Sequence, residues 1–315
     1  MTTATNGAGR AARTIAALAA SAMLAACGAN SQSASTIPQQ PMANAQATRL
    51  GHAGSWMDPA AKSQKLVYVS DFLSADVDVY TYPYLRLAGV LTGFKFLRGM
   101  CTDPSGYVWI VDNAEGAVFE YAHGGTTPVN TLTATAPNGC ATNPKNGDLA
   151  VSDGASGQIE IFHNAAGYGT VVADSNFTAT MYLGYDKAGN LFVDGYNPYP
   201  TFHYAELPAG GSSFTDITLS QTPQAPGNVQ WDGTYMAVGD TGSTIYQTQG
   251  STVVSSTTLG FGCVDQFYIV PSKRKVIAPD LCNATVGIVA YPGGGAALKT
   301  ISGGLQSPVG TVLSL

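Results

Sequence analysis

Six short apolar runs, each ending in an aspartate, recur along the chain from residue 66 onward. They are Val67–Asp71, Val108–Asp112, Leu149–Asp153, Leu191–Asp194, Met236–Asp240 and Val276–Asp280. A nearly constant interval separates successive aspartates, and only the step from Asp194 to Asp240 is longer. A period of about 40 residues with several short strands per unit is typical of a β-propeller, with four strands in each blade. The pattern therefore predicts an all-β, six-bladed propeller over residues 66–315.

The second repeat unit contains all four predicted strands. From the axis outward they are the inner strand 98–102, the second strand 107–111, the third strand 117–121 and the outer strand 128–132. The turn Asp103–Gly106 separates the first two strands. Turns of the form Asp/Asn-x-x-Gly supply the positive φ angle that tight hairpins require, and they recur in the following units.

The two ends of the repeat region are complementary. The first unit opens at Leu66 directly on a second-strand pattern, with no inner strand before it. The last segment, 307–315, has the pattern of an inner strand with no blade after it. We expect the C-terminal strand to complete blade 1 and close the ring, because closure removes the exposed strand edges that an open fan would present.

The N-terminal segment has the layout of a secretory signal. Arg10 and Arg13 precede an uncharged small and apolar run, residues 14–26, of about 13 residues, which is too short to cross a bilayer. Leu24-Ala25-Ala26-Cys27 resembles the lipobox of bacterial lipoproteins, in which the cysteine is lipidated and becomes the mature N-terminus. The alternative is an ordinary signal peptide with a chance cysteine. The lipobox predicts a chain anchored to the membrane at Cys27.

The signal peptide thus covers residues 1–26, and a lipidated flexible tether covers residues 27–65. The tether is rich in Ala, Ser, Gln, Asn and Pro, a composition that favours disorder. Trp56 and Met57 near its end are instead expected to pack onto the domain. Gly28 directly after the lipidated cysteine favours sorting of the protein to the outer membrane, if the cell has one. The predicted location is the bacterial cell envelope, facing the periplasm or the cell exterior.

Charge narrows the choice of partners. Without residues 1–26 the chain has 12 basic and 20 acidic residues, a net charge of −8. This balance argues against nucleic acid and anionic lipid headgroups as partners, because both call for clustered Lys and Arg. We expect a monomer.

Four cysteines follow Cys27, and an even number in an exported protein favours disulfides. Cys101 and Cys140 lie near the starts of neighbouring inner strands. Cys263 precedes the inner strand of blade 6, and Cys282 follows its second strand. We predict the pairs Cys101–Cys140 and Cys263–Cys282.

Two repeat units, 101–112 and 185–194, resemble the NHL repeat, a propeller blade of the form D-x-x-G-N-L-y-V-a-D. The resemblance covers residues 66–315 and extends to gluconolactonase-like and streptogramin-lyase-like propellers. More closely, the chain resembles a group of uncharacterised bacterial lipoproteins that share the segment 55–62 and the Gly-Cys-Ala inner strand at Gly139. The resemblance implies the fold and leaves the function open.

The strand-end aspartates are the first candidate site, because all six should lie on one face of the ring. They are Asp71, Asp112, Asp153, Asp194, Asp240 and Asp280. An acidic ring of this kind would bind a cation or a basic partner. The alternative is that each aspartate accepts N–H bonds from its own turn. Repetition in every blade favours this structural role.

A loop in blade 4 is the best candidate for ligand contact. Residues 195–200 lengthen one connection on the face that carries the aspartates, and Pro198 and Pro200 stiffen this loop, which contains Tyr196, Asn197 and Tyr199. Such a stiff aromatic lip is suited to stacking on a sugar or an apolar ligand. The alternative is a loop that packs over its own blade.

A metal site is not predicted. His123, His163 and His203 are spaced about one repeat apart, so they belong to different blades. Side chains placed in this way cannot converge to zinc–nitrogen distances of about 2 Å. In gluconolactonase-like enzymes a glutamate and several Asn/Asp residues hold a divalent metal in the central channel, and here no glutamate falls on a predicted inner strand. Streptogramin-lyase-like catalysis needs a histidine facing the channel, and none is predicted there.

These observations favour a non-catalytic, lipid-anchored propeller that binds a protein, a glycan or a small ligand, without a cofactor. The alternative is a gluconolactonase-like or streptogramin-lyase-like hydrolase or lyase, and only in that case is a divalent metal such as Ca²⁺ expected in the channel. A third hypothesis is an assembly factor for envelope proteins.

Overall fold

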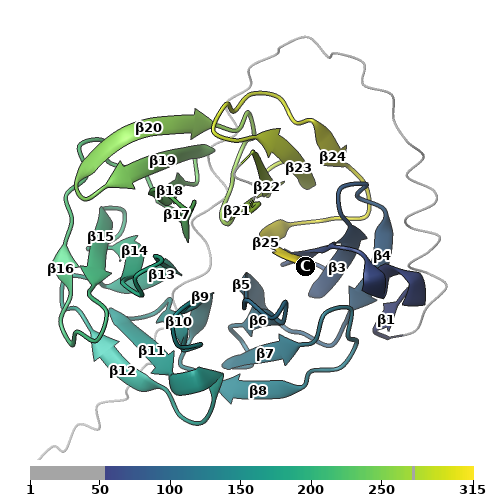
Figure 1. The fold of residues 1–315 in the computed structure, drawn as a ribbon, viewed down its shortest axis with the longest axis horizontal. Helices are drawn as coiled ribbons and strands as arrows, with labels where there is room; N and C mark the ends of the chain where they lie inside the picture. The colour runs from purple at the N-terminus through teal and green to yellow at the C-terminus, as the bar shows by residue number, and fades with distance from the viewer. Residues whose placement is uncertain (1–53, 272–273) are drawn as a thin grey trace, which may run out of the picture. The chain divides into compact units, whose positions relative to one another are not determined.

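The computed structural model describes residues 54–271 and 274–315, whose strands form six antiparallel sheets around a common axis (Figure 1). This arrangement confirms the all-β, six-bladed propeller. The predictions for the signal peptide, Cys27 and the tether up to residue 53 lie outside the described residues.

The strands occupy equivalent positions in the six blades. The inner strands are β25 (Pro308–Ser314), β5 (Leu97–Thr102), β9 (Pro137–Thr142), β13 (Ala179–Tyr185), β17 (Pro226–Trp231) and β21 (Tyr268–Ile269). The second strands are β2 (Leu66–Asp71), β6 (Val108–Asp112), β10 (Leu149–Asp153), β14 (Leu191–Tyr196), β18 (Met236–Asp240) and β22 (Lys275–Asp280).

Two further strands complete each blade. The third strands are β3 (Asp76–Thr81), β7 (Ala117–Tyr121), β11 (Gln158–Phe162), β15 (Phe202–Leu207), β19 (Thr244–Gln249) and β23 (Thr285–Ala290). The outer strands are β4 (Leu87–Leu91), β8 (Asn130–Thr133), β12 (Thr170–Ala173), β16 (Thr215–Asp216), β20 (Thr252–Thr258) and β24 (Lys299–Ile301). Two short 3₁₀ helices are η1 (Pro59–Ser63) and η2 (His163–Ala165).

The C-terminal strand closes the ring. β25 pairs antiparallel with β2 from Leu66↔Ser314 to Ser70↔Gly310, and it occupies the inner position of blade 1. The predicted closure is therefore confirmed. Blade 1 is thus built from segments at the two opposite ends of the repeat region.

The folded domain begins earlier than Leu66, and the predicted end of the tether needs correction. A short strand, β1 (Trp56–Met57), pairs with β4, placing Met57 opposite Gly89. Helix η1 follows, and the Asp58 side chain accepts the Ala60 N–H at 2.9 Å as its N-cap. Met57 packs on the core between blades 1 and 2. The expected packing of Trp56 and Met57 on the domain is thus confirmed, although a strand at this position was not predicted.

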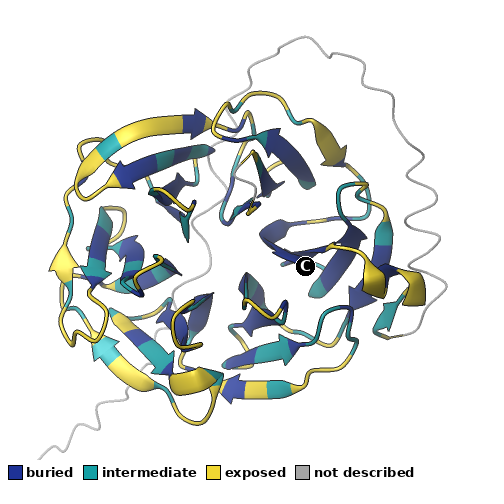
Figure 2. Ribbon diagram, in the orientation of Figure 1, coloured by how far each residue is buried: buried dark blue, intermediate teal, exposed yellow. Residues whose placement is uncertain are grey.

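The core is divided among the interfaces between blades. Six hydrophobic clusters are present, one between each pair of neighbouring blades. On β2, Leu66 and Tyr68 pack toward blade 2, whereas Val67 and Val69 pack toward blade 6. Both faces of such a strand are buried, which explains the uninterrupted apolar runs in the sequence. Figure 2 shows the burial concentrated near the axis and the exposure at the outer strands.

Glycines let the inner strands approach one another around the axis. Gly99, Gly139 and Gly310 are each the third residue of an inner strand. A Cβ atom on Gly139 would lie 2.8 Å from the Met181 carbonyl oxygen of the next blade, and one on Gly99 would lie 3.1 Å from the Asn138 carbonyl oxygen. The close approach therefore requires glycine here.

The side chain of Gln266 ties three blades together at the axis. Its Oε1 accepts the backbone N–H of Met100 at 3.0 Å and of Thr311 at 3.2 Å, and its Nε2 donates to the Met100 carbonyl at 2.7 Å. Gln266 is buried and belongs to blade 6, while its partners belong to blades 2 and 1. These bonds satisfy backbone groups that would otherwise be buried without partners.

Disulfides link Cys101 to Cys140 and Cys263 to Cys282, the two pairs predicted from the sequence. The first joins the inner strands of blades 2 and 3. Disulfides of this kind are typical of proteins in oxidising, extracytoplasmic compartments. Among the described residues, no helix has the length and apolar character needed to cross a membrane.

The packing at the axis can be tested at a single glycine. Gly139→Ala should lower the free energy of unfolding by about 1–3 kcal/mol, because the added methyl group forces two inner strands apart. Gly293→Ala is the control, since its added Cβ would meet nothing nearer than 3.8 Å and its φ is not positive. Denaturant unfolding of both variants checks this expectation, and equal effects would contradict it.

Candidate functional site

The strand-end aspartates lie on one face of the ring, where each inner strand begins and each second strand ends; we call it the aspartate face. All six side chains are buried, with at most 4% of their surface exposed. Asp112 shows their common role. Its carboxylate accepts the N–H groups of Lys95 (2.7 Å) and Phe96 (3.0 Å) before the inner strand, and of Glu115 (3.2 Å) in the following turn.

Three other aspartates bridge the same two segments of their blades. They are Asp71, Asp240 and Asp280. Asp153 accepts bonds from its own turn, from Ala155 N–H and Ser156 Oγ. Since these carboxylates are buried and bonded within their blades, their geometry supports the structural alternative rather than an acidic ligand ring.

Asp194 differs from the other five aspartates. Its Oδ1 accepts the Tyr182 N–H at 2.9 Å, but its Oδ2 is buried without a hydrogen-bond partner. Burial raises the pKa of Asp194 well above its ordinary value, against the opposing effect of the backbone N–H groups of Tyr182 and Gly227. The Gly227 N–H acts on the carboxyl without meeting the geometry of a hydrogen bond to Oδ2. A buried carboxyl with an unused oxygen is a candidate functional group.

Arg98, on the inner strand of blade 2, is a cation whose charge acts on Tyr182 of blade 4 and Asp265 of blade 6. Its guanidinium carbon lies 4.5 Å from the centre of the Phe96 ring and 5.6 Å from that of Phe72. The two rings pack edge to face with their centres 4.5 Å apart. The Arg98 Nε is buried without a hydrogen-bond partner. Stacking on two aromatic rings fixes the guanidinium and leaves donor capacity unused.

Asp265, just before β21, supplies a carboxylate from blade 6. Burial raises its pKa, and the positive charge of Arg98 opposes this rise. Among the described residues no hydrogen bond or ion pair to the Asp265 carboxylate is found, and the residue keeps part of its surface exposed. Asp265 and Arg98 therefore lie within electrostatic range of each other without direct contact.

Two tyrosines of blade 4 interact electrostatically with Arg98, Asp194 and Asp265. Burial raises the pKa of Tyr182, and the negative charge of Asp265 adds to the rise. Burial, together with the charge of Asp194, raises the pKa of Tyr196 to about 12. Arg98, Tyr182, Asp194, Tyr196 and Asp265 thus form one electrostatically linked set from blades 2, 4 and 6, which we call the mouth cluster.

The aromatic lip adjoins the mouth cluster through Tyr196. The rings of Tyr196 and Tyr199 meet edge to face, with their centres 5.1 Å apart, and Tyr199 is 64% exposed. Asn197 donates its N–H to the Thr201 carbonyl at 2.9 Å, which closes the loop on itself. The lip therefore holds one half-buried and one exposed tyrosine beside the axis.

Tyr196 and Asp194 were among the candidate residues predicted from the sequence, whereas Arg98, Tyr182 and Asp265 were not. A usable signal existed for Arg98, because a charge on an inner strand is unusual at the centre of a propeller. Asp265 lies just outside the inner strand of blade 6. Nothing in the local sequence indicates that it lies near Arg98.

A cavity lies on the axis at the opposite face. It has a volume of about 360 Å³ and is lined by the far ends of the inner strands, including Thr102, Thr142, Gln230 and Tyr268. Among the described residues, Asp103 is the single charged side chain of this lining. Its Oδ1 accepts the N–H groups of Ser105 and Tyr107, each at 2.9 Å, so the carboxylate is engaged in its own turn.

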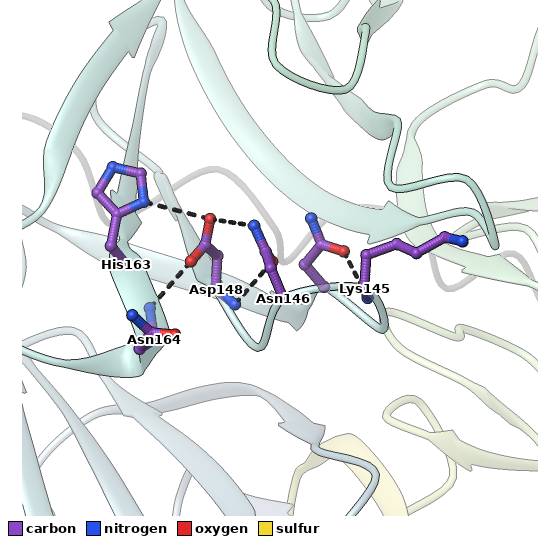
Figure 3. Close-up of polar contacts among 6 residues, drawn as sticks. Lys145, Asn146, Asp148, His163 and Asn164 are labelled. Atoms are coloured by element: carbon purple, nitrogen blue, oxygen red, sulfur yellow. Dashed lines mark hydrogen bonds and ion pairs between the residues drawn. The ribbon is translucent and has the colours of Figure 1, made fainter.

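The three histidines are held by different partners. His163 Nδ1 lies 3.2 Å from Asp148 Oδ2 in a cleft between blades 3 and 4 (Figure 3). The same carboxylate accepts bonds from Asn146 Nδ2 and the Asn164 N–H, so it is fully engaged. His123 Nδ1 lies 2.6 Å from Ser314 Oγ, and His203 Nε2 lies 3.1 Å from Asp216 Oδ1. The histidines therefore do not converge on one point.

Comparison with known proteins agrees with the fold. A chain of the nidogen/laminin complex matches with a TM-score of 0.66 at 12% sequence identity, over 80% of this chain and 98% of that chain. At this identity the likeness shows the six-bladed β-propeller fold alone. No protein-family model and no curated protein matches the chain.

The buried carboxyl of Asp194 gives a pH-dependent prediction. Because folding raises the pKa of Asp194, the wild-type protein loses stability as the pH rises from the unfolded pKa, near 4, toward the folded pKa, by up to about 1.4 kcal/mol per pH unit. Asp194→Asn removes this loss. Its Tm relative to wild type should therefore increase between pH 4 and pH 8.

Asp112→Asn is the matched control, because both Asp112 oxygens accept backbone N–H groups. An amide nitrogen facing one of these donors should cost about 1–3 kcal/mol. Thermal unfolding at several pH values compares the two variants. If Asp194→Asn lowers Tm as much as Asp112→Asn does at every pH, the raised pKa of Asp194 is contradicted.

Proposed function

We propose that this chain is a lipid-anchored, extracytoplasmic binding module without catalytic activity, and that its ligand is a glycan bearing a carboxylate. The ligand docks at the mouth cluster and the aromatic lip on the aspartate face. The lipobox at Cys27 supports the anchor, and the NHL-like repeats support the propeller fold. The two disulfides fit an envelope location.

The single observation that carries this proposal is the unused bonding capacity within the mouth cluster. The Arg98 Nε and the Asp194 Oδ2 have no hydrogen-bond partner, and the Asp265 carboxylate has none among the described residues. Elsewhere on this face the strand-end carboxylates are engaged by backbone N–H groups. Convergent polar groups beside exposed aromatic rings are typical of ligand sites.

The chemistry of the groups favours an acidic sugar. A tyrosine ring stacks on the apolar face of a sugar, and Tyr199 is exposed for this contact. A guanidinium can bind a carboxylate through two parallel N–H bonds. Stacking on aromatic rings holds the guanidinium plane in place for this contact. Asp265 can accept bonds from sugar hydroxyl groups.

A propeller hydrolase or lyase is the second candidate. The raised pKa values of Asp194 and Asp265 favour it, because such carboxyls occur in active sites. The opposite end of the channel offers less support for metal-dependent chemistry. Its cavity lining has one carboxylate, Asp103, which is engaged in its own turn.

Glycan binding can be measured by calorimetry with hexuronic-acid oligosaccharides and a muramic-acid disaccharide as probes. Tyr199→Ala should weaken binding roughly three- to tenfold while leaving Tm nearly unchanged, since this residue is exposed. Arg98→Gln should weaken binding of acidic sugars at least about tenfold and spare neutral ones, because it removes the charge-assisted pair.

Tyr168→Ala is the matched control, because Tyr168 is 97% exposed in the β11–β12 connection on the opposite face. It should bind as the wild type does. Binding unchanged by Arg98→Gln and Tyr199→Ala would refute the site. Turnover of a probe, detected as product in the same samples, would favour the enzyme instead.

A further inference from the structure

A second polar cluster lies at the outer rim, where blades 3 and 4 meet. His203 on β15 and Asp216 on β16 belong to blade 4, and Asp174 follows β12 of blade 3. The Nε2 of His203 lies 3.1 Å from Asp216 Oδ1 and 3.9 Å from Asp174 Oδ2. One donor atom from each residue lies within 4.8 Å of the other two.

One asparagine orients both carboxylates. The Asn176 N–H donates to Asp174 Oδ1 at 2.9 Å, and its Nδ2 donates to Asp216 Oδ2 at 2.7 Å. The remaining oxygens, Asp174 Oδ2 and Asp216 Oδ1, are the ones nearest to His203. This division of the oxygens is the arrangement that outer hydrogen bonds impose on metal ligands.

Asp174 provides an independent sign of a missing partner. Its side chain is 10% exposed, and its Oδ2 is buried without a hydrogen bond. A buried carboxylate oxygen without a partner is costly unless a cation approaches it. The oxygen lies nearest to the His203 nitrogen, where such a cation would be shared.

We propose that Asp174, His203 and Asp216 bind one divalent transition-metal ion, for which Zn²⁺ is the representative. A tetrahedral Zn²⁺ with bonds of about 2.0–2.2 Å separates its ligand atoms by about 3.3–3.6 Å. The observed separations of 3.1 and 3.9 Å need only small side-chain adjustments to reach this geometry. Ca²⁺ is disfavoured, because it takes six to eight oxygen ligands and the site offers an imidazole nitrogen.

The metal would join two blades at the base of the aromatic lip. The Phe177 ring packs edge to face on His203, with their centres 4.5 Å apart, and the Thr178 N–H donates to the Tyr196 carbonyl at 2.7 Å. Asp216 is 48% exposed, which leaves solvent access for the ion and for a water as fourth ligand. The site thus fixes the chain beneath the lip and is independent of the proposed glycan binding.

The test is titration of the chain with Zn²⁺ in a Cys27→Ser background, which cannot be lipidated at this position and carries no thiol there if lipidation fails. Calorimetry should give one Zn²⁺ per chain. Saturation at a hundredfold excess over Kd should raise Tm by roughly 5 °C or more. X-ray absorption should report one nitrogen and two or three oxygens at about 2.0–2.2 Å.

Asp174→Asn is the decisive variant. Its side-chain oxygen still accepts the Asn176 N–H, so it should fold, yet it should lose at least about tenfold in Zn²⁺ affinity and the Tm shift. His203→Gln should do the same. His163→Gln is the matched control, since His163 also pairs with one aspartate, and it should bind Zn²⁺ as the wild type does.

Several results would overturn the proposed Zn²⁺ site. A wild-type chain that binds no Zn²⁺ overturns the proposal, as does an Asp174→Asn variant that binds it unchanged. Loss of binding in His163→Gln places the ion in the other cleft and overturns it too. A Tm shift by Ca²⁺ equal to that by Zn²⁺ would mean that the imidazole is not a ligand.

Discussion

Every blade of this propeller buries both faces of its inner and second strands against its neighbours, so blade 6 and blade 1 must meet before either is complete. The pairing of β25 with β2 provides this contact. Val67 and Val69 on β2 then pack against blade 6, together with Leu313 of β25. Since the apolar core consists of inter-blade layers, an open ring would leave apolar surface and strand edges exposed at two blades.

Closure also creates the site. Arg98, Tyr182 and Asp265 come from blades 2, 4 and 6, and the closed ring brings these alternate blades together around the axis. Gln266, beside Asp265, fixes blade 6 to blades 2 and 1 by bonding to Met100 and Thr311. The polar groups at the mouth are therefore positioned by rigid inner strands, an arrangement that favours binding without a large conformational change.

The sequence predicted the fold well because a propeller repeats local signals. Each blade has its own strand-end aspartate, blades 2 to 4 have a turn that opens with Asp or Asn and ends with Gly, and the offset between Leu66 and the segment 307–315 indicated closure. Cysteine pairing followed from the same register. The start of the domain was placed too late, because Trp56 and Met57 form a strand only through contact with β4.

The site was less predictable, because its groups are distant in sequence and irregular from blade to blade. Asp194 shares the motif of the other strand-end aspartates. Its Oδ2 lacks a hydrogen-bond partner because of its three-dimensional surroundings, which the motif does not reveal. His203 was correctly separated from the other histidines, yet its neighbours Asp174 and Asp216 depend on the contact between blades 3 and 4, which periodicity does not describe.

The most direct test of ring closure is thermal unfolding of a chain that ends after Ser307 and so lacks β25. The account predicts that this chain loses the cooperative transition of the full-length protein and exposes apolar surface. It also predicts that a synthetic 307–315 peptide restores the transition by pairing with β2. A truncated chain that unfolds cooperatively at the full-length Tm would contradict the account.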